Sequence, residues 1–264
     1  MPLLSVIMSV FNGEKYVKET VESILNQSFR DFEFIIVNDG STDGTPRILR
    51  NFDDDRIKII DQENQGPAKA RNRAIRVSKG KYIGIIDCGD VAFKKKMEIQ
   101  INFLERNKEI YGVGAWANIV DEDGKIVGVM EQSTEFKDIK KTILKSNTFI
   151  HSSMVFRRKL FDKIGLYDES FKFAHDYDLV IRAVRKFKIV NIPQVLLNYR
   201  ISEESISFQK RKQQSYYALK IRARALGHGY PTWQCIYLIR PFFSFLVPAD
   251  LKNVIVRRFL WRPR

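Results

Sequence analysis

Apolar and polar residues alternate in blocks along the N-terminal third of the chain. Four short apolar runs, at residues 5–11, 32–39, 57–61 and 81–87, read SVIMSVF, FEFIIVND, IKIID and KYIGIID. The stretches between them carry apolar residues at the 3.6-residue spacing of a helix. Strands that alternate with helices are typical of βα units, so the pattern predicts a parallel sheet covered by helices.

Turn and cap residues mark where the predicted helices begin. We interpret Asn12-Gly13 as the cap of the first helix, Thr45-Pro46 as the N-cap and first residue of the second, and Gly66-Pro67 as the start of the third. The apolar face of the first helix consists of Val17, Val21, Ile24 and Leu25. Each predicted helix is therefore amphipathic and packs one face on the sheet.

Polar and acidic residues follow the ends of the four predicted strands. In open α/β sheets ligands bind beyond the carboxyl ends of the strands, which meet at one edge. A single acid there could be a simple cap or turn residue, but several acids at one edge repel one another unless a cation or a donor-rich ligand compensates them. The residues at these ends are Val10, Phe11 and Asn12, then Asn38 to Ser41, Asp61 and Gln62, and Asp87 to Asp90, with Arg71 on the helix between the last two.

The chain after Asp90 continues the mixture of helices and strands. A further helix is predicted around Met97, Ile101 and Leu104, and a hairpin turning at Asp123-Gly124. Another helix begins close to three ionisable residues, His175, Asp176 and Asp178. Acids at a helix start can simply complement the helix dipole, so on their own these residues leave a structural and a functional interpretation open.

Composition restricts the class of protein. A chain of 264 residues, 44% of them hydrophobic and 29% charged, has the size of one large globular domain or of one domain with an appendage. The first residues, MPLLSVIMSV, lack the basic start and cleavage site of a signal peptide, and Cys88 and Cys235 lack metal-ligand spacing. We therefore expect free thiols and a cytoplasmic protein.

The net charge of +14 is distributed very unevenly. Residues 207–264 contain twelve Lys and Arg against one acid, Asp250, so this segment carries +11 and the rest of the chain +3. A basic nucleic-acid binder would explain the segment but not the acids Asp39, Asp87 and Asp176, and we expect no nucleic-acid partner.

Six segments, in this order and spacing, resemble the motifs of the family 2 glycosyltransferases over roughly residues 3–205. They are SVIMSVFNGEKYVKETVESILNQSF, FEFIIVNDGSTDGT, NQGPAKARNRAI, KYIGIIDCGD, NTFIHSSMVFRR and AHDYDLVIRAV. The resemblance implies an inverting enzyme with the GT-A fold, an α/β fold with a Rossmann-like, mostly parallel central sheet flanked by helices. We expect this domain over residues 1–206, followed by a basic, amphipathic helical extension over residues 207–264.

The resemblance also implies roles for individual residues. Val10 and Phe11 would line the base pocket, Asp39 would accept a hydrogen bond from a pyrimidine, and Arg71 would lie against the base or its phosphates. Asp87 would contact the ribose or the metal shell. The general base would be Asp176, with His175 in place of the family's usual glutamate. The remaining expected site residues are Asn12 and Gly40 in the nucleotide pocket and His151, His175 and Asp178 on the acceptor or diphosphate side.

The chemistry of sugar transfer agrees with separate groups of acids. The diphosphate leaving group needs positive charge, and Mn²⁺ or Mg²⁺ prefers carboxylate and phosphate oxygens, whereas the base must act on the acceptor hydroxyl from the opposite face of the sugar. Asp87 and Asp90 are the expected metal ligands, although Gly89 stands where the family usually has the acidic ligand. Three readings stay open: Asp90 enters the metal shell, a metal-free mechanism uses Arg or Lys, or the protein is a weakened homologue.

His151 and His175 each allow two interpretations. His151 either meets the diphosphate or acceptor or is satisfied in a loop network, and His175 is either a neutral stand-in that tunes Asp176 or a simple surface substitution. Another nucleotide-sugar enzyme on the same fold, such as a nucleotidylyltransferase, would need a glycine-rich, lysine-bearing loop after the first strand, which VFNGEKYV lacks.

The basic segment mixes large apolar residues with Arg and Lys. CIYLIRPFFSFLVP is too short, and too interrupted by Arg240 and Pro241, to span a membrane. It could lie on an anionic membrane surface or pack back on the domain. The first interpretation predicts a peripheral protein at the inner face of the cell membrane with a membrane-held acceptor. The family resemblance implies a UDP- or dTDP-sugar as donor and a saccharide or lipid-linked saccharide as acceptor, in cell-surface polysaccharide synthesis.

Overall fold

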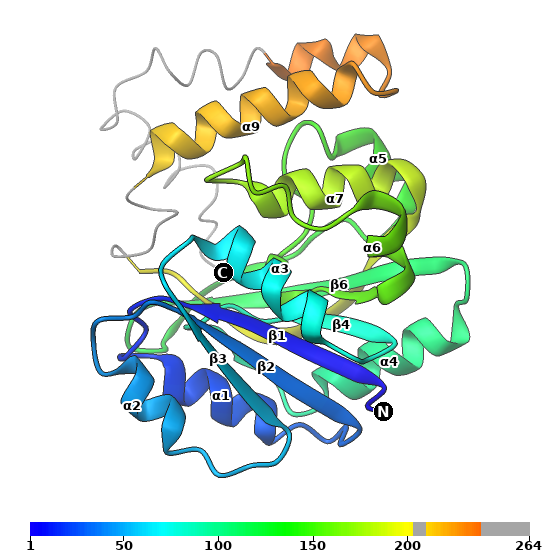
Figure 1. The fold of residues 1–264 in the computed structure, drawn as a ribbon. Coiled ribbons are helices and arrows are strands. Elements are labelled where there is room, and N and C mark those ends of the chain that lie inside the picture. Colours follow the sequence, from blue (N-terminus) through cyan, green and yellow to red (C-terminus); the bar gives the residue numbers. More distant parts are fainter. Residues whose placement is uncertain (203–209, 239–264) are drawn as a thin grey trace.

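A computed structural model describes residues 1–202 and 210–238 of the chain. One mixed sheet of nine strands runs through the molecule in the order β3-β2-β1-β4-β8-β6-β9-β5, with β7 paired to β6 (Figure 1). The predicted α/β fold is therefore confirmed.

The N-terminal half of the sheet consists of four parallel strands. They are β1 (Leu4–Val10), β2 (Phe32–Asp39), β3 (Ile57–Gln62) and β4 (Tyr82–Ile85). β1 and β2 are buried along nearly their whole length, because helices cover both faces of the sheet, and buried parallel strands accordingly have nearly continuous apolar sequences. The carboxyl ends of all four strands lie at one edge, as the sequence predicts.

The C-terminal half of the sheet is mixed. β8 runs antiparallel to its neighbours β4 and β6, while the long strands β6 and β9 pair in parallel. β6 and β7 form the predicted hairpin, with Gly124 in the turn at a φ of +82°. The strands are β5 (Val91–Ala92), β6 (Ile110–Val120), β7 (Ile126–Met130), β8 (Val155–Arg157) and β9 (Lys188–Arg200).

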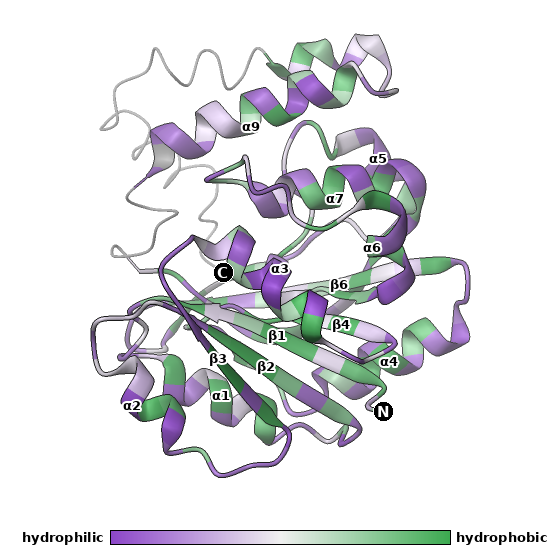
Figure 2. Ribbon diagram, in the orientation of Figure 1, coloured by the Kyte–Doolittle hydropathy of each residue, from purple (hydrophilic) through white to green (hydrophobic). Residues whose placement is uncertain are grey.

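Helices form a layer on each face of the sheet, and each layer has its own apolar core (Figure 1). One layer consists of α1 (Val17–Leu25), α2 (Thr45–Arg50) and α4 (Lys96–Arg106). The other consists of α3 (Pro67–Val77), α5 (Phe136–Thr142), α6 (Arg158–Ile164), α7 (His175–Lys186) and α9 (Arg211–Leu226). Figure 2 shows the result, with hydrophobic strands between helices that turn hydrophilic faces outward.

Two predicted helix starts are wrong in detail. α1 begins at Val17 and has no side-chain cap, because Asn12 adopts a left-handed φ of 52° and directs its side chain to the loop after β2. α2 has Gly44 as its N-cap, so Thr45 is the first helical residue and its hydroxyl instead accepts a hydrogen bond from Gly13. The start of α3 at Gly66-Pro67 is as predicted.

The described part of the chain from residue 210 onward is mostly helical, and it packs on the preceding part. Ile221 and Ala225 of α9 belong to the same apolar core as α7, and a short 3₁₀ helix, Thr232–Cys235, follows. Within residues 1–202 and 210–238, no helix has the length and apolarity needed to cross a membrane. The predicted boundary at 206/207 and the segment after residue 238 lie outside the described residues.

Candidate functional site

The loops that follow β1 and β2 are joined to each other at the sheet edge. The Asn12 N–H donates to Ser41 Oγ over 2.9 Å, and Asn12 Oδ1 accepts from the Thr42 N–H over 2.8 Å. Val10 is buried beneath this loop, whereas the Phe11 side chain is 47% exposed. A large exposed aromatic ring on a hydrogen-bonded loop offers a planar ligand a surface for stacking.

Asp39, at the end of β2, is buried and accepts three hydrogen bonds within the protein. They come from the Gln62 side chain (2.7 Å), the Gln65 N–H (2.9 Å) and the Gly66 N–H (2.8 Å). A carboxylate has about four acceptor positions, so one is left for a ligand donor. Gly40 beside it has a φ of +76°, and a Cβ there would lie 2.7 Å from the Asn64 nitrogen, so the close approach of the two loops requires glycine.

Arg71 of α3 and Asp87, just after β4, form an ion pair at the centre of the edge. The Nη2 to Oδ1 distance is 2.6 Å, and the two side chains are 9% and 32% exposed. Although burial opposes the charge on Asp87, Arg71 and His151 beside it lower the pKa of this carboxyl well below its ordinary value. Asp87 is therefore ionised and partly accessible to a ligand.

His151 contacts the same Asp87 carboxylate, and Tyr167 contacts His151. His151 Nδ1 lies 3.4 Å from Asp87 Oδ2, and its Nε2 is hydrogen-bonded to the Tyr167 hydroxyl at 2.8 Å. The Tyr167 ring also meets the His175 ring edge-on, at 5.8 Å between centroids. His151 is thus hydrogen-bonded within a network of loop residues, and this network places its ring directly beside Asp87.

His175, the first residue of α7, accepts a hydrogen bond from Arg71. Burial and the positive charge of Arg71 lower the pKa of His175 to about 3, so the ring is neutral at pH 7. Since a guanidinium can only donate, Nε2 is the acceptor and the ring proton lies on Nδ1. Nδ1 is buried without a hydrogen-bond partner among the described residues.

Asp176 follows in the first turn of α7. Its side chain is partly exposed, and no residue of 1–202 or 210–238 donates a hydrogen bond to its carboxylate. The charge of Asp176 nevertheless acts on Arg71, Tyr167 and His175, contributing to the raised pKa values of the first two. Asp176 thus lies beside the cluster with a partly exposed side chain.

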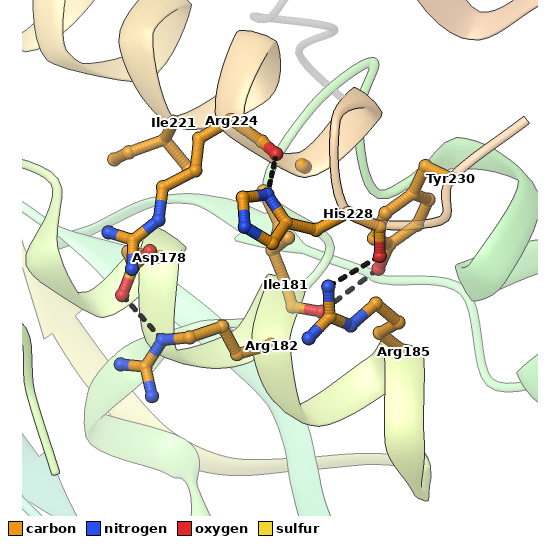
Figure 3. Close-up of a pocket in the computed structure, with 9 residues that line it drawn as sticks. Asp178, Ile181, Arg182, Arg185, Ile221, Arg224, His228 and Tyr230 are labelled. Atoms are coloured by element: carbon orange, nitrogen blue, oxygen red, sulfur yellow. Dashed lines mark hydrogen bonds and ion pairs between the residues drawn. The ribbon is translucent and has the colours of Figure 1, made fainter. Parts of the chain in front are cut away.

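Asp178 is not brought into this cluster. Its buried carboxylate accepts a hydrogen bond from Arg182 Nε over 2.7 Å and lines a small pocket between α7 and α9 (Figure 3). Burial raises its pKa. The ion pair of Asp178 is thus made within α7, at the side of the helix that lines this pocket.

Asp90 is buried on the inner side of the turn after β4. Oδ1 accepts the Arg200 N–H over 2.9 Å, and Oδ2 has no partner among the described residues. Burial and the neighbouring Asp87 raise its pKa to about 7. Within residues 1–202 and 210–238 no three His, Cys, Asp or Glu side chains are grouped to hold a metal ion. A divalent ion could still be held by one or two carboxylates together with the phosphates of a ligand, and Asp87 is the more exposed of the two carboxylates.

Two residues of this site were not predicted from the sequence. Arg200, at the end of β9, donates to the Gly89 carbonyl and to Glu19, and so fixes the turn that carries Asp87 and Asp90. Tyr167 joins both histidines, yet it lies in a segment without regular structure or a motif that would single it out.

Comparison with known proteins places the chain among sugar-transferring enzymes. Residues 5–165 match the model of the family described as Glycosyl transferase family 2. The chain is 36% identical over 270 residues to an uncharacterized glycosyltransferase of Methanocaldococcus jannaschii, covering 97% of this chain and 93% of that one.

Two solved structures share the fold at low sequence identity. S. aureus TarS 1–349 in complex with UDP-GlcNAc superposes with a TM-score of 0.73 at 20% identity, covering 93% of this chain and 73% of that chain. The mannosyltransferase PcManGT from Pyrobaculum calidifontis, in complex with GDP-Man and Mn²⁺, superposes with a TM-score of 0.67 at 16% identity, covering 99% and 81%. These likenesses confirm the GT-A fold.

Proposed function

The chain belongs to glycosyl transferase family 2, and from this we propose that it is an inverting hexosyltransferase acting on a nucleotide-diphosphate sugar. We propose UDP- or dTDP-sugar as donor, and a saccharide or lipid-linked saccharide as acceptor. That TarS holds UDP-GlcNAc and PcManGT holds GDP-Man on the same fold supports a nucleotide-sugar donor.

One observation carries the proposal: the connection between the sheet edge and the start of α7. Asp87 binds Arg71, Arg71 binds His175, and the next residue is Asp176, whose carboxylate has no hydrogen-bond donor among the described residues. Inverting transfer needs a group that faces the leaving diphosphate and a separate base that faces the acceptor hydroxyl. The pair of Asp87 and Arg71 is suited to face the leaving diphosphate, and Asp176 is suited to act as the base.

In the proposed reaction Asp176 accepts the proton of the acceptor hydroxyl as its oxygen attacks the anomeric carbon. The bond between that carbon and the diphosphate oxygen breaks, and the nucleoside diphosphate leaves with the bonding electrons. Because the attack comes from the face opposite the leaving group, configuration at the carbon inverts. His175 is neutral and adds no charge beside Asp176, which leaves the carboxylate free to act as the base.

The nucleotide would lie along the loops after β1 and β2. Phe11 offers its exposed face to the base over buried Val10, Asp39 has one acceptor position left for a pyrimidine N–H, and Asn12 and Gly40 hold the loops together. The diphosphate would then reach Arg71 and Asp87.

Asp87 would hold Mn²⁺ or Mg²⁺ together with the donor phosphates, and the presence of Mn²⁺ with GDP-Man in the PcManGT structure supports this proposal. Such an ion would neutralise the negative charge that develops on the leaving diphosphate. Asp90 could join only by giving its unpaired Oδ2 to the metal while Oδ1 stays bound to Arg200.

We also propose that the acceptor is held at a membrane during cell-surface polysaccharide synthesis. Residues 239–264 contain six Arg and Lys among large apolar residues, a composition that favours anionic lipid surfaces.

The decisive experiment replaces the proposed base. Asp176→Asn keeps the size of the side chain and removes its basicity, so UDP release from UDP-GlcNAc, UDP-glucose or UDP-galactose should fall roughly 10²- to 10⁴-fold, while UDP affinity by calorimetry stays within about twofold. Asp162→Asn, an exposed aspartate of α6, is the control and should leave both unchanged.

Unchanged turnover in Asp176→Asn would refute the assignment of the base. A wild-type chain that binds UDP but releases none from any donor would instead be the catalytically weakened homologue.

A further inference from the structure

The segment that leads to the proposed base has no regular secondary structure of its own. Residues 165–174 form neither helix nor strand, and they connect α6 to the first turn of α7. Ala174, the last of them, has a left-handed φ of 56°, a conformation that costs a non-glycine residue about 1–2 kcal/mol. Contacts from outside the segment must therefore hold it in place.

α3 holds the first end of this segment. The Tyr167 N–H donates to Asn72 Oδ1 and Asn72 Nδ2 donates to the Tyr167 carbonyl, both over 2.9 Å, and Nδ2 also donates to Glu169 over 2.8 Å. Asn72 is buried, so water cannot readily replace these bonds. This fixes Tyr167 but leaves residues 168–174 to other partners.

α9 supplies the partners for the middle of the segment. Arg224 donates to Asp168 Oδ2 over 2.6 Å and its guanidinium lies 5.7 Å from the centre of the Phe171 ring. The Tyr217 ring meets those of Phe171 and Phe173 at 6.2 and 5.7 Å between centroids. Three residues of the segment thus contact one face of α9.

A third α9 residue holds the helical turn that contains the proposed base. Buried Arg222 donates from Nε to the Tyr177 hydroxyl and from Nη2 to the Lys145 carbonyl, both over 3.1 Å. The Tyr177 hydroxyl in turn donates to the Ile143 carbonyl over 2.6 Å. Tyr177 directly follows Asp176 in the chain, so this network restrains the turn on which Asp176 lies.

The seam between α7 and α9 is apolar at its centre and polar around it. Figure 3 shows Asp178, Arg182 and Arg224 at one side of this seam and His228, Arg185 and Tyr230 at the other. The Tyr230 hydroxyl, from the chain after α9, donates to the Ile181 carbonyl of α7 over 2.9 Å. α9 is therefore docked along α7 by core packing as well as by its contacts with residues 168–173.

We infer that α9 is part of the catalytic unit, and that Tyr217, Arg222 and Arg224 are positioning residues that hold Asp176 where it acts. The inference rests on the proposed role of Asp176 as base. The Arg224–Asp168 pair does not suffice alone, since its side chains are 46% and 26% exposed and such pairs contribute little. Loss of the contacts made by these α9 residues together would free residues 168–176. The proposed nucleotide pocket, at the ends of β1 to β4, would keep its own contacts.

The test compares two double variants of the full-length chain. Tyr217→Ala with Arg224→Ala removes the contacts with the segment. Lys212→Ala with Lys220→Ala removes two long side chains at exposed positions of the same helix and leaves the contacts of Tyr217 and Arg224 intact. Tyr217→Phe with Arg224→Lys keeps a ring and a charge at both contact positions and serves as the rescue. For each protein, hydrogen exchange of residues 166–177 and of β1, UDP affinity, and UDP release from a UDP-sugar are measured.

The first variant should exchange roughly tenfold faster than wild type in residues 166–177 but not in β1, and release UDP roughly 10- to 100-fold more slowly with UDP affinity within about twofold. The control and rescue variants should behave like wild type. Unchanged exchange in residues 166–177, or equal effects in the control, would overturn the inference. If wild type turns over no donor, the proposed function fails, while the exchange data still decide whether α9 holds the segment.

Discussion

Replacing Arg71 by methionine tests the centre of the site. Methionine resembles the arginine stem in length but donates no hydrogen bond, so the variant deprives Asp87 and His175 of their shared partner. Breaking a fully buried ion pair from one side costs about 3–5 kcal/mol. Because the Asp87 side chain is 32% exposed and water can reach it, we expect the free energy of unfolding to fall by about 2–3 kcal/mol at pH 7.

The loss of unfolding free energy in Arg71→Met should also depend on pH, and this dependence tests the electrostatic role of Arg71 more specifically. In the wild type, burial and Arg71 depress the pKa of His175 from 6.5 to about 3, and Arg71 with His151 depresses that of Asp87 despite its burial. Both groups bind fewer protons folded than unfolded, so wild-type stability falls as pH drops below about 6.5. Without Arg71 both pKa values move back toward their ordinary values, so the variant loses less stability in acid.

The difference between wild type and Arg71→Met should therefore shrink by about 1 kcal/mol or more between pH 7 and pH 4. Urea unfolding followed by circular dichroism at both pH values measures it. Arg73→Met, an exposed position of the same helix, is the control and should change stability by less than about 0.5 kcal/mol. A difference that is the same at both pH values would refute the proposed electrostatic coupling.

Two further predictions concern the metal and the membrane. UDP should bind more tightly in Mn²⁺ than in EDTA by calorimetry, because Asp87 and the phosphates share the ion; equal affinity in both would favour a metal-free mechanism. The full-length chain should partition onto anionic liposomes more strongly than a chain ending at residue 238, since each Arg or Lys near such a surface contributes about 1 kcal/mol; equal partitioning would exclude residues 239–264 as the anchor.

The N-terminal half of the fold was predictable from the sequence because its rules are local. Buried parallel strands appear as continuous apolar runs, and Gly66-Pro67 marks a helix start through backbone geometry alone. β9 was missed because Pro193 interrupts its apolar run, and its pairing with β6 shifts register three times.

The positions of the strand-end residues could be predicted from the sequence, but the contacts that connect these residues to one another could not. The topology of a parallel sheet brings Asp39 and Asp87 to one edge, so their proximity follows from strand order. Nothing local indicates that Arg71 would bind both Asp87 and His175, because these contacts depend on how α7 packs against α3. The residue roles themselves stay predictions until the variants are measured.

The bond between Asp90 and Arg200 has a consequence for the order in which the chain is made. The two residues are 110 positions apart, and ribosomes add about 5–20 residues per second, so Asp90 waits roughly 5–20 s for its partner. During that interval the Asp90 carboxylate, which is buried in the complete protein, lacks its N–H donor. The turn after β4 also lacks the arginine that fixes it. The four parallel strands can thus pair before β9 is made, whereas the turn with Asp87 and Asp90 gains its contacts with Arg200 only after synthesis has passed β9.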